Sequence, residues 1–460
     1  MGLLDTFRNR VLNWLMPEDM YSPVSRELLL RYDRLRNYVR GEHKRPIVVK
    51  PDQPDDNLAI NFTGLVVDRS LSLLFGKEPT FDLPGDGESA EDVYLDQVWR
   101  ANKKAILLHH LAYYGSTYGT CYVKLQPDGK GEGIPRLIAL NPFFMVIKTS
   151  PEDKDQVLAY EMRYMTLDEK SREIAKKEVV QVAVGSLEEG QAPASWEVIS
   201  FAATGGRWTE TKRLEWDQPF PPIIHWQNLP DPESCYGKAD IDGNVIALQD
   251  AVNFVASNIN RILRYHAHPK TWGSGFTGQT DKLSWGADEM IKLPGEAGKI
   301  ANLEMQSDLG SSTKFMELLR QSLFDISQTV DISSMADKLG ALTNFGLRVL
   351  FFDAMNKLGT KRQLYGDGLT ELNRRLLVLG GKKAEDPGRV VWQDVLPVNE
   401  LDQAQTLTAD LNSGVVSKET ASTKRGYDWK TEEERINMAR SSSDNVGAAL
   451  LRAFDQGKGA

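Results

Sequence analysis

The sequence predicts an α+β protein that combines a helical layer, an antiparallel sheet and a hairpin of two long helices. Apolar residues recur at helical spacing up to residue 118, alternate at strand spacing from 119 to about 230, and return to helical spacing from Asp240 onward. The chain has 460 residues, of which 41% are hydrophobic and 26% charged. This length and composition are typical of a folded protein of several domains.

Residues 22–118 are predicted to be mainly helical. A helix over residues 25–39 ends at Gly41 and carries its apolar side chains on one face: Leu28, Leu29, Tyr32, Leu35 and Tyr38. Further helices are expected over residues 61–75, which stop at Gly76, and over residues 92–114, which stop at Gly115. This region is therefore expected to supply the helical layer.

Residues 119–230 are predicted to form an antiparallel sheet packed on these helices. Strands are expected over residues 120–126 and 134–140, which flank a turn with the sequence PDGKGEG. Six more are expected over residues 143–149, 157–165, 178–184, 196–201, 207–214 and 222–226. The loops between them are short and polar, as is typical of antiparallel neighbours.

One long helix is predicted over residues 240–268, with a length of about 42 Å at 1.5 Å per residue. An apolar seam follows one edge of it, through Ile241, Val245, Leu248, Val252, Val255, Ile259 and Ile262. A polar stripe follows another edge and comprises Gln249, Asn253, Ser257, Asn260 and Arg264. Surface helices ordinarily carry Glu and Lys at such positions, so the neutral amides of the stripe call for a specific explanation.

A second long helix is predicted over residues 311–332, after a turn-rich module over residues 269–310. Its apolar stripe comprises Phe315, Leu319, Leu323, Ile326 and Val330. The two helices are expected to form a protruding hairpin. A long apolar stripe on a protrusion needs a neighbour, and the best candidate is another copy of the chain.

The C-terminal region is predicted to be helical after a loop over residues 333–344. A long helix is expected over residues 345–379, ending at Gly380 and Gly381. A strand near residues 390–392 and three short helices, after Asn399, Ser417 and Thr431, are expected to follow. Residues 441–460 are expected to form a flexible tail.

The charge and the motifs argue against several classes of function. Lys and Arg total 55 against 64 Asp and Glu, and this net charge of -9 argues against a protein that grips nucleic acid with a broad basic face. The same net charge is compatible with a protein along which nucleic acid slides without being held. Cys121 and Cys235 are expected to be free thiols, with a disulfide as the alternative.

No enzymatic function is expected, because the sequence contains neither a GxSxG elbow nor an HExxH motif. The loop from Gly273 to Thr280 is similar to a phosphate-binding loop but has Gln279 where the lysine belongs. His266 and His268 are not accompanied by a cysteine or carboxylate cluster. We therefore expect no catalytic residue, no metal site and no cofactor, and the hydropathy predicts no membrane span or signal peptide.

Several segments together resemble the portal proteins of tailed bacteriophages, especially those of long-tailed siphophages. The resemblance lies in residues 32–43 (YDRLRNYVRGEH), 61–79 (NFTGLVVDRSLSLLFGKEP), 114–125 (YGSTYGTCYVKL) and 140–142 (LNP), then in residues 322–331, 392–397 (WQDVLP) and 414–420 (GVVSKET). Their order and spacing match the family across most of the chain. One departure, TNFGL over residues 343–347 where many relatives have a Ser-Gly-x-Ala-Leu-like sequence, leaves the boundaries of the preceding loop open by a few residues.

The resemblance implies a division of the chain into named parts. Residues 1–239 would form the wing with an N-terminal arm, residues 240–268 and 311–332 the two stem helices, and residues 269–310 the clip, with Trp272, Phe276 and Trp285. Residues 333–344 would be the tunnel loop, 345–390 the long wing helix and its connection, 391–440 the crown, and 441–460 the flexible tail.

The resemblance also implies the function. Usually twelve copies would form a ring at one vertex of the virion capsid, assembled in the cytoplasm of the host bacterium, and double-stranded DNA would pass through the ring during packaging and ejection. The implied partners are the terminase large subunit, which is the separate ATPase, a head-completion or adaptor protein, the major capsid protein and a scaffolding protein.

Two groups of residues would face DNA on this hypothesis. The polar stripe of the first stem helix would line the channel or a water-filled groove, because amides and hydroxyls stay hydrated without offering fixed cations; the alternative is that it faces outside solvent. The apolar seam would pack within the ring. The tunnel loop would project inward, with Met335, Lys338, Leu339, Leu342, Thr343 and Asn344.

A rival hypothesis keeps the helical hairpin but assigns no role to DNA. An amphipathic helix near the N-terminus, with Leu3, Leu4, Phe7, Val11, Leu12 and Leu15, would anchor a peripheral membrane scaffold. The same helix could instead dock on protein.

Overall fold

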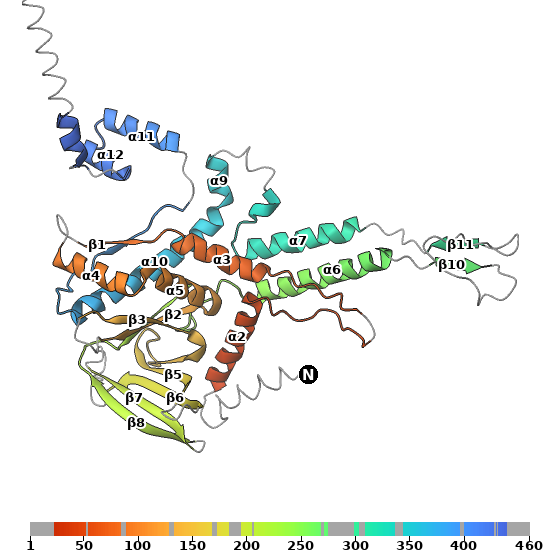
Figure 1. Ribbon diagram of the computed structural model, residues 1–460, viewed down its shortest axis with the longest axis horizontal. Coiled ribbons are helices and arrows are strands. Elements are labelled where there is room, and N and C mark those ends of the chain that lie inside the picture. The colour runs from red at the N-terminus through yellow and green to blue at the C-terminus, as the bar shows by residue number, and fades with distance from the viewer. Residues whose placement is uncertain are drawn as a thin grey trace, which may run out of the picture. The chain divides into compact units, whose positions relative to one another are not determined.

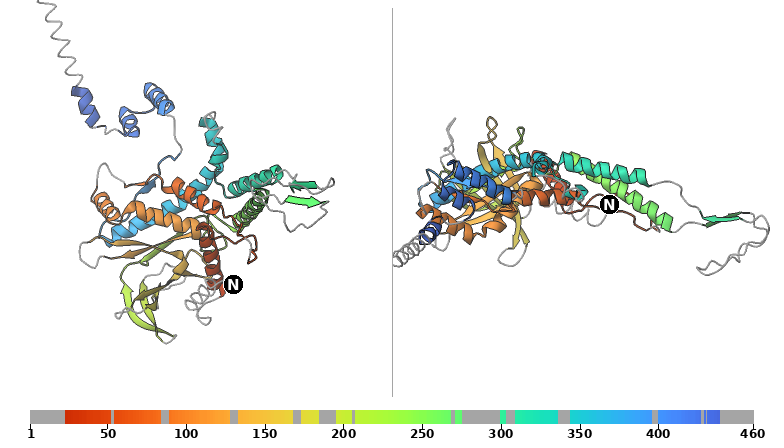
Figure 2. Two further views of the ribbon diagram at one scale, coloured as in Figure 1. Left: turned by 45° about the vertical axis from the view of Figure 1, so that its right-hand side comes forward. Right: turned by 90° about the horizontal axis from the view of Figure 1, so that it is seen from above.

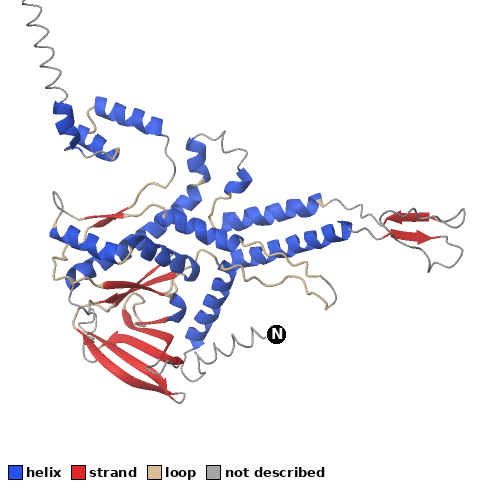
Figure 3. Ribbon diagram, in the orientation of Figure 1, coloured by secondary structure: helices blue, strands red, loops and turns tan. Residues whose placement is uncertain are grey.

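The computed structural model describes residues 23–51, 54–83, 89–127, 133–167, 173–183, 195–204, 207–267, 271–274, 299–302, 309–335, 344–395, 400–426, 429 and 431–438. The chain divides into two compact units. The first comprises Met1–Ala341 and Arg348–Val395, and the second comprises Leu342–Leu347 and Leu396–Ala460. The mixture of helices and antiparallel sheets confirms the predicted α+β class (Figures 1 and 3).

The helical layer of the first unit consists of α2 (Pro23–Val39), α3 (Phe62–Phe75), α4 (Ala90–Ala101), α5 (Lys104–Tyr118) and α10 (Phe352–Leu379). The single helix predicted over residues 92–114 is two helices, α4 and α5. They are separated at Lys103, which has the left-handed backbone conformation (φ 52°). The Asn102 side chain holds this break, because its amide donates to the carbonyls of Val98 and Pro135.

The predicted sheet region forms two separate antiparallel sheets. The first has the order β3-β2-β9 and consists of β3 (Arg136–Leu140), β2 (Thr120–Gln126) and β9 (Ile223–Gln227). The second has the order β4-β5-β6-β7-β8, with β4 (Met145–Thr149), β5 (Val157–Leu167), β6 (Glu173–Val182), β7 (Trp196–Thr204) and β8 (Arg207–Trp216). A short 3-10 helix, η2 (Pro142–Phe144), separates β3 of the first sheet from β4 of the second, and the chain returns to the first sheet at β9.

The hydrophobic core lies where α5 and α10 pack on β2 and β9, and its largest fully buried side chains include Trp99, Tyr122 and Tyr365. Gly119 joins α5 to β2 with a φ of 96°, and a Cβ there would lie 2.2 Å from the carbonyl oxygen of Gly237. Glycine is required at this position by both its conformation and its surroundings.

The predicted hairpin consists of α6 (Gly243–Ala267) and α7 (Gly310–Ile326), which lie side by side in each view (Figures 1 and 2). Helix α6 begins three residues later than predicted, because the Asp242 carboxylate accepts from the backbone amides of Asn244 and Val245 and so caps it. Between the helices, β10 (Thr271–Ser274) and β11 (Lys299–Asn302) form an antiparallel pair that the sequence did not predict.

Helix α7 ends at Ile326 rather than at residue 332. Gln328 adopts a φ of 53°, and the Thr329 amide bonds back to the carbonyl of Phe324, as in a Schellman motif. A 3-10 helix, η4 (Ile332–Met335), follows. The long helix predicted over residues 345–379 is divided into α9 (Asn344–Leu350) and α10 at Phe351, which has non-helical dihedrals.

The short strands and helices near the C-terminus follow the predicted order. Strand β12 (Arg389–Val391) pairs with β1 (Thr80–Asp82) in the first unit. The second unit contains α11 (Glu400–Asn412) and α12 (Lys418–Lys424), which the Ser417 hydroxyl caps, and residues 431–438 are also helical.

Candidate functional site

The polar stripe of α6 contacts the backbone of its own chain. Residues 56–63, here named the strap, run along the helix. Gln249 accepts from the backbone amides of Phe62 and Thr63 (3.0 and 3.2 Å) and donates to the carbonyl of Ile60 (2.6 Å). The Asn253 side-chain oxygen accepts from the Ile60 amide (3.0 Å). One face of the helix therefore satisfies backbone hydrogen bonds of the segment that leads into α3 and of the first two residues of α3.

The ladder continues toward the far end of α6. The Ser257 hydroxyl accepts from the Leu58 amide (2.9 Å), and Asn260 donates to the Asp56 carbonyl (3.1 Å). The Arg264 guanidinium pairs with the Asp56 carboxylate at 2.6 Å. Side chains four residues apart on a helix are separated by about 6 Å, and alternate residues of an extended chain by about 6.6 Å. This near match lets successive helix side chains bind alternate strap residues.

The ladder corrects the prediction for the stripe. Gln249, Asn253 and Ser257 are 0% exposed, so they face neither a channel nor a water-filled groove. Neutral amides occur here because one amide side chain can both donate to a backbone carbonyl and accept from a backbone amide. An ionised Glu side chain can only accept, and a Lys ammonium can only donate. Asn260 and Arg264 remain partly exposed.

His43 connects the ladder to α2. Its Nδ1 lies 2.8 Å from the Asn253 amide nitrogen, which donates to it, and its Nε2 lies 3.0 Å from the Tyr38 carbonyl, to which it donates. The imidazole stacks on the Tyr38 ring, and the Tyr38 hydroxyl donates to Asp250 of α6 at 2.6 Å. The end of α2 is thereby fixed to the hairpin.

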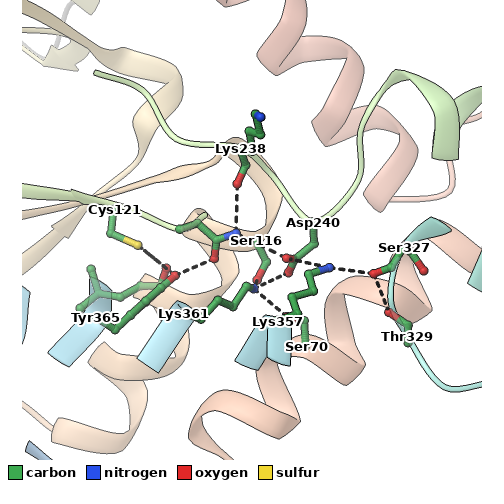
Figure 4. Close-up of polar contacts among 12 residues, drawn as sticks. Ser70, Ser116, Cys121, Lys238, Asp240, Ser327, Thr329, Lys357, Lys361 and Tyr365 are labelled. Atoms are coloured by element: carbon green, nitrogen blue, oxygen red, sulfur yellow. Dashed lines mark hydrogen bonds and ion pairs between the residues drawn. The ribbon is translucent and has the colours of Figure 1, made fainter. Parts of the chain in front are cut away.

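A buried ion cluster lies where the chain enters α6 (Figure 4). The Asp240 carboxylate is 2.6 Å from the Lys361 ammonium and 3.2 Å from the Lys357 ammonium. The Lys361 ammonium also donates to the hydroxyls of Ser70 (2.7 Å) and Ser116 (3.2 Å). The cluster therefore joins α3, α5 and α10 to the base of the hairpin.

Burial and charge shift the pKa values in this cluster in opposite senses. Burial would raise the pKa of Asp240, but the ammonium groups of Lys357 and Lys361 outweigh it and hold that pKa well below its ordinary value. Burial lowers the pKa of Lys361 to about 8, against the opposing effect of Asp240. Two ammonium groups thus share one buried carboxylate.

The Lys357 ammonium contacts both helices of the hairpin at their base. Besides its ion pair with Asp240, which precedes α6, it donates to the carbonyl of Ser327, the residue directly after α7 (2.8 Å). Beyond this point, Arg69 of α3 donates to the Val330 carbonyl, and Arg320 pairs with Asp331 at 2.7 Å. The backbone after α7 is held by cations from three elements.

A second buried network adjoins the ion cluster. The Tyr365 hydroxyl donates to Asn228 (3.1 Å), and the Cys121 thiol donates to the Tyr365 oxygen (3.2 Å). Burial raises the pKa of Cys121 to about 12, so this thiol is not activated as a nucleophile. Cys121 and Cys235 are both free, which confirms the preferred prediction.

The sequence offered a signal for the ion cluster that was missed. Lys361 lies on the buried stripe of α10 formed by Ala354, Leu358, Tyr365, Leu369 and Leu372, at positions spaced by three and four residues. A lysine inside an apolar stripe requires a buried partner. The partner of Lys361 is Asp240, which lies three residues before the start of α6.

Across the described ranges, no group of His, Cys, Asp or Glu side chains is arranged to hold a metal ion. A search of the same ranges for a helix long and apolar enough to cross a membrane finds none.

Comparison with known proteins identifies the family. The profile described as phage portal protein, SPP1 Gp6-like, matches residues 23–435. The chain belongs to this family of phage portal proteins. The predicted resemblance is thus confirmed, and membership places the portal protein in a phage virion, within a family of structural proteins that form rings in the capsid.

Other comparisons add less. No curated protein matches the portal protein. Among the solved structures, it is similar to a chain from the virion of a native gene transfer agent particle, with 12% identity and a TM-score of 0.48, over 86% of this chain and 93% of that chain.

The apolar seam of the portal protein's first long helix divides into two parts. Ile241, Val245 and Val252 are buried within the chain, so the prediction that they pack against other copies is wrong for them. Leu248, Val255, Ile259 and Ile262 are partly exposed. The well-exposed apolar side chains of the two helices are instead Phe254, Leu263, Phe315, Leu318 and Ile326.

Several predicted residues of the portal protein lie outside the described residues. Of the expected tunnel loop, Met335 ends η4 and Asn344 begins α9, whereas Lys338, Leu339, Leu342 and Thr343 are not described. Of the expected clip, Trp272 lies in β10 opposite Ala301, whereas Phe276 and Trp285 are not described. The N-terminal helix expected before residue 23 is likewise outside the described residues.

Proposed function

We propose that this portal protein forms a ring of usually twelve copies at one capsid vertex, and that double-stranded DNA passes along its axis during packaging and ejection. The observation that carries the proposal is the family match over residues 23–435, which includes the helical hairpin. The stem is α6 and α7 in this proposal, and the wing comprises the helical layer and the two sheets.

Exposed apolar side chains on the stem support contact between copies. Phe315 and Leu318 lie one turn apart on α7 and are 51% and 57% exposed. Phe254 of α6 is exposed to a similar extent. Large apolar side chains grouped on a helix pair indicate a surface that another protein covers, and in a ring the neighbouring copy does so.

The other partners follow from the same proposal. Residues 269–310 form the clip, which docks the terminase large subunit during packaging and a head-completion or adaptor protein afterwards. The ATPase is a separate chain. The major capsid protein and a scaffolding protein are further partners of the portal protein during assembly.

The tunnel loop over residues 333–344 is proposed to contact DNA at the narrowest part of the channel. The root of this loop is held by Lys357, Arg69 and Arg320, so its position depends on the base of the stem. Shortening the loop should reduce DNA packaging while rings still assemble. Normal packaging by rings of the shortened variant would reject a DNA-contacting role.

The stem contact is tested with paired substitutions. Phe315→Ser with Leu318→Ser should shift the purified protein from rings to monomers, as measured by mass photometry. Leu167→Ser with Leu214→Ser, at exposed leucines of β5 and β8, provides the matched control and should leave assembly unchanged. Equal assembly of the two variants would contradict the proposed stem contact.

A further inference from the structure

The charge of the portal protein is unevenly distributed along the chain. Residues 23–50, which cover α2 and the segment after it, contain eight Lys and Arg against three Asp and Glu, a net charge of +5 (8 − 3). The whole chain carries -9, so all other residues together carry -14 (-9 − 5). A concentrated positive region within an acidic protein indicates a surface for a polyanion.

We propose that this region binds the phosphate backbone of duplex DNA through its exposed cations Arg31, Arg34, Arg40, Lys44 and Lys50, here together named the basic face. The inference rests on the proposed function, which brings duplex DNA to the protein. All five side chains are exposed. Within the described part of the chain, Arg31, Arg40, Lys44 and Lys50 form no ion pair, in contrast to the nearby pairs Arg36–Asp33 and Arg45–Asp55.

The basic face is held in place by the core. The opposite face of α2 is buried through Leu28, Leu29, Tyr32 and Leu35, and the Tyr38 hydroxyl ties the helix to Asp250. Arg31 and Arg34 are one turn apart on the outer side of the helix. Cations on a fixed helix need little ordering when they bind, which favours a lasting contact.

The surroundings of these cations favour duplex DNA over other polyanions. Single-stranded nucleic acid is bound through exposed aromatic rings on which bases stack, whereas both tyrosines of α2, Tyr32 and Tyr38, are buried. A protein partner would require an apolar centre to the interface. Among the described residues from α2 to Lys50, the exposed large apolar side chains are Leu30 and Val48, which lie 18 residues apart and do not form an apolar centre. Phosphate contacts alone suit a duplex of any sequence.

The basic face has a role distinct from that of the channel. Phosphate binding by fixed cations is tight and salt-dependent, because it releases counterions, and such binding in the channel would obstruct movement. We therefore assign the basic face to DNA that the particle holds at rest, and not to DNA in transit through the axis.

The test compares two variants of equal charge. In the first, Arg31, Arg34, Arg40 and Lys44 are each replaced by Gln. In the second, four exposed lysines elsewhere, Lys212, Lys238, Lys382 and Lys383, are each replaced by Gln. Binding of a short mixed-sequence DNA duplex to rings of the full-length protein is measured over a range of NaCl concentrations.

We expect the basic-face variant to bind at least about tenfold more weakly at low salt, with a log Kd against log salt slope reduced by about three to four. The control variant should bind like the wild type. Equal binding by both variants would overturn the proposal. The proposal would also be overturned if the basic-face variant assembled poorly into rings but bound DNA normally. The basic face would then be a contact between copies. Failure of the proposed function can be distinguished from failure of the basic-face proposal, because wild-type rings would then support no DNA packaging.

Discussion

The Lys361 ammonium lies 2.6 Å from the Asp240 carboxylate, and the two side chains are 2% and 0% exposed. Asp240 lies three residues before the start of α6, and Lys361 lies inside the long helix α10, 121 residues away in the sequence. Together with Lys357, which also donates to the Ser327 carbonyl after α7, this pair fixes the base of the α6–α7 hairpin to α10. We expect the stem of each copy to move with α10 as one piece.

Removing the carboxylate should destabilise the protein more than removing one lysine. Asp240→Asn leaves two buried ammonium groups without a counter-charge, and we expect a loss of about 3–5 kcal/mol in the free energy of unfolding. Lys361→Met leaves Asp240 paired with Lys357 and should cost clearly less. Chemical denaturation at fixed protein concentration measures both, with Lys382→Met as an exposed control. The reverse ranking would show that the carboxylate is not the centre of the cluster.

The stability of the protein should depend on pH through Lys361. Its pKa is lowered from 10.5 to about 8, so between these values the unfolded chain binds a proton that the folded protein does not. The contribution of Lys361 should therefore increase the free energy of unfolding as the pH rises through this window, by an amount on the order of 1 kcal/mol by pH 9.5. This gain is absent below pH 8.

The control for this pH dependence is the Lys361→Met variant, which has no group to titrate at this position. The difference in stability between wild type and variant should shift in favour of the wild type between pH 7 and pH 9.5. Parallel pH profiles for the two proteins would count against a lowered pKa for Lys361.

The strap should loosen when the amide ladder of α6 is interrupted. Asn253→Ala removes the acceptor of the part-buried Ile60 amide, and we expect a cost of about 1 kcal/mol in the free energy of unfolding. Hydrogen exchange of the backbone amides of residues 58–63 should accelerate. Asn258→Ala, on the same helix but outside the ladder, is the control and should leave exchange in the strap unchanged. Similar exchange in both variants would mean that the ladder does not hold the strap.

The end of α7 offers a stabilising substitution. Gln328 has the left-handed conformation that glycine adopts without strain, and its side chain is exposed. Gln328→Gly should therefore raise the free energy of unfolding by up to about 1 kcal/mol. Gln321→Gly, in the interior of the same helix, should lower it by about 1 kcal/mol. A loss of stability in both variants would show that Gln328 makes contacts that outweigh its strain.

The sequence predicted the helices and strands well because their apolar periodicities are strong. It failed where a local interaction decides the outcome. The break at Lys103 depends on the Asn102 side chain, whose partner Pro135 comes from a distant segment. The end of α7 depends on a non-glycine residue in a conformation that glycine usually takes.

The site was harder to predict than the fold. An amide on a helix face has the same sequence signature whether it meets water or a peptide backbone, so the partners of Gln249 and Asn253 could not be read from periodicity. The seam was predicted as a contact between copies, but its residues Ile241, Val245 and Val252 are covered by the chain's own core. Which apolar side chains of the hairpin stay exposed, such as Phe254, Phe315 and Leu318, depends on how α6 packs against α7 and could not be predicted from the sequence.

Electron microscopy of the purified full-length chain, carried to a reconstruction that resolves helices, tests the central claim most directly. We expect closed rings around an open axis, with Phe315 and Leu318 of each stem covered by the neighbouring copy. A population of isolated single chains, or rings in which these two side chains face solvent, would contradict it.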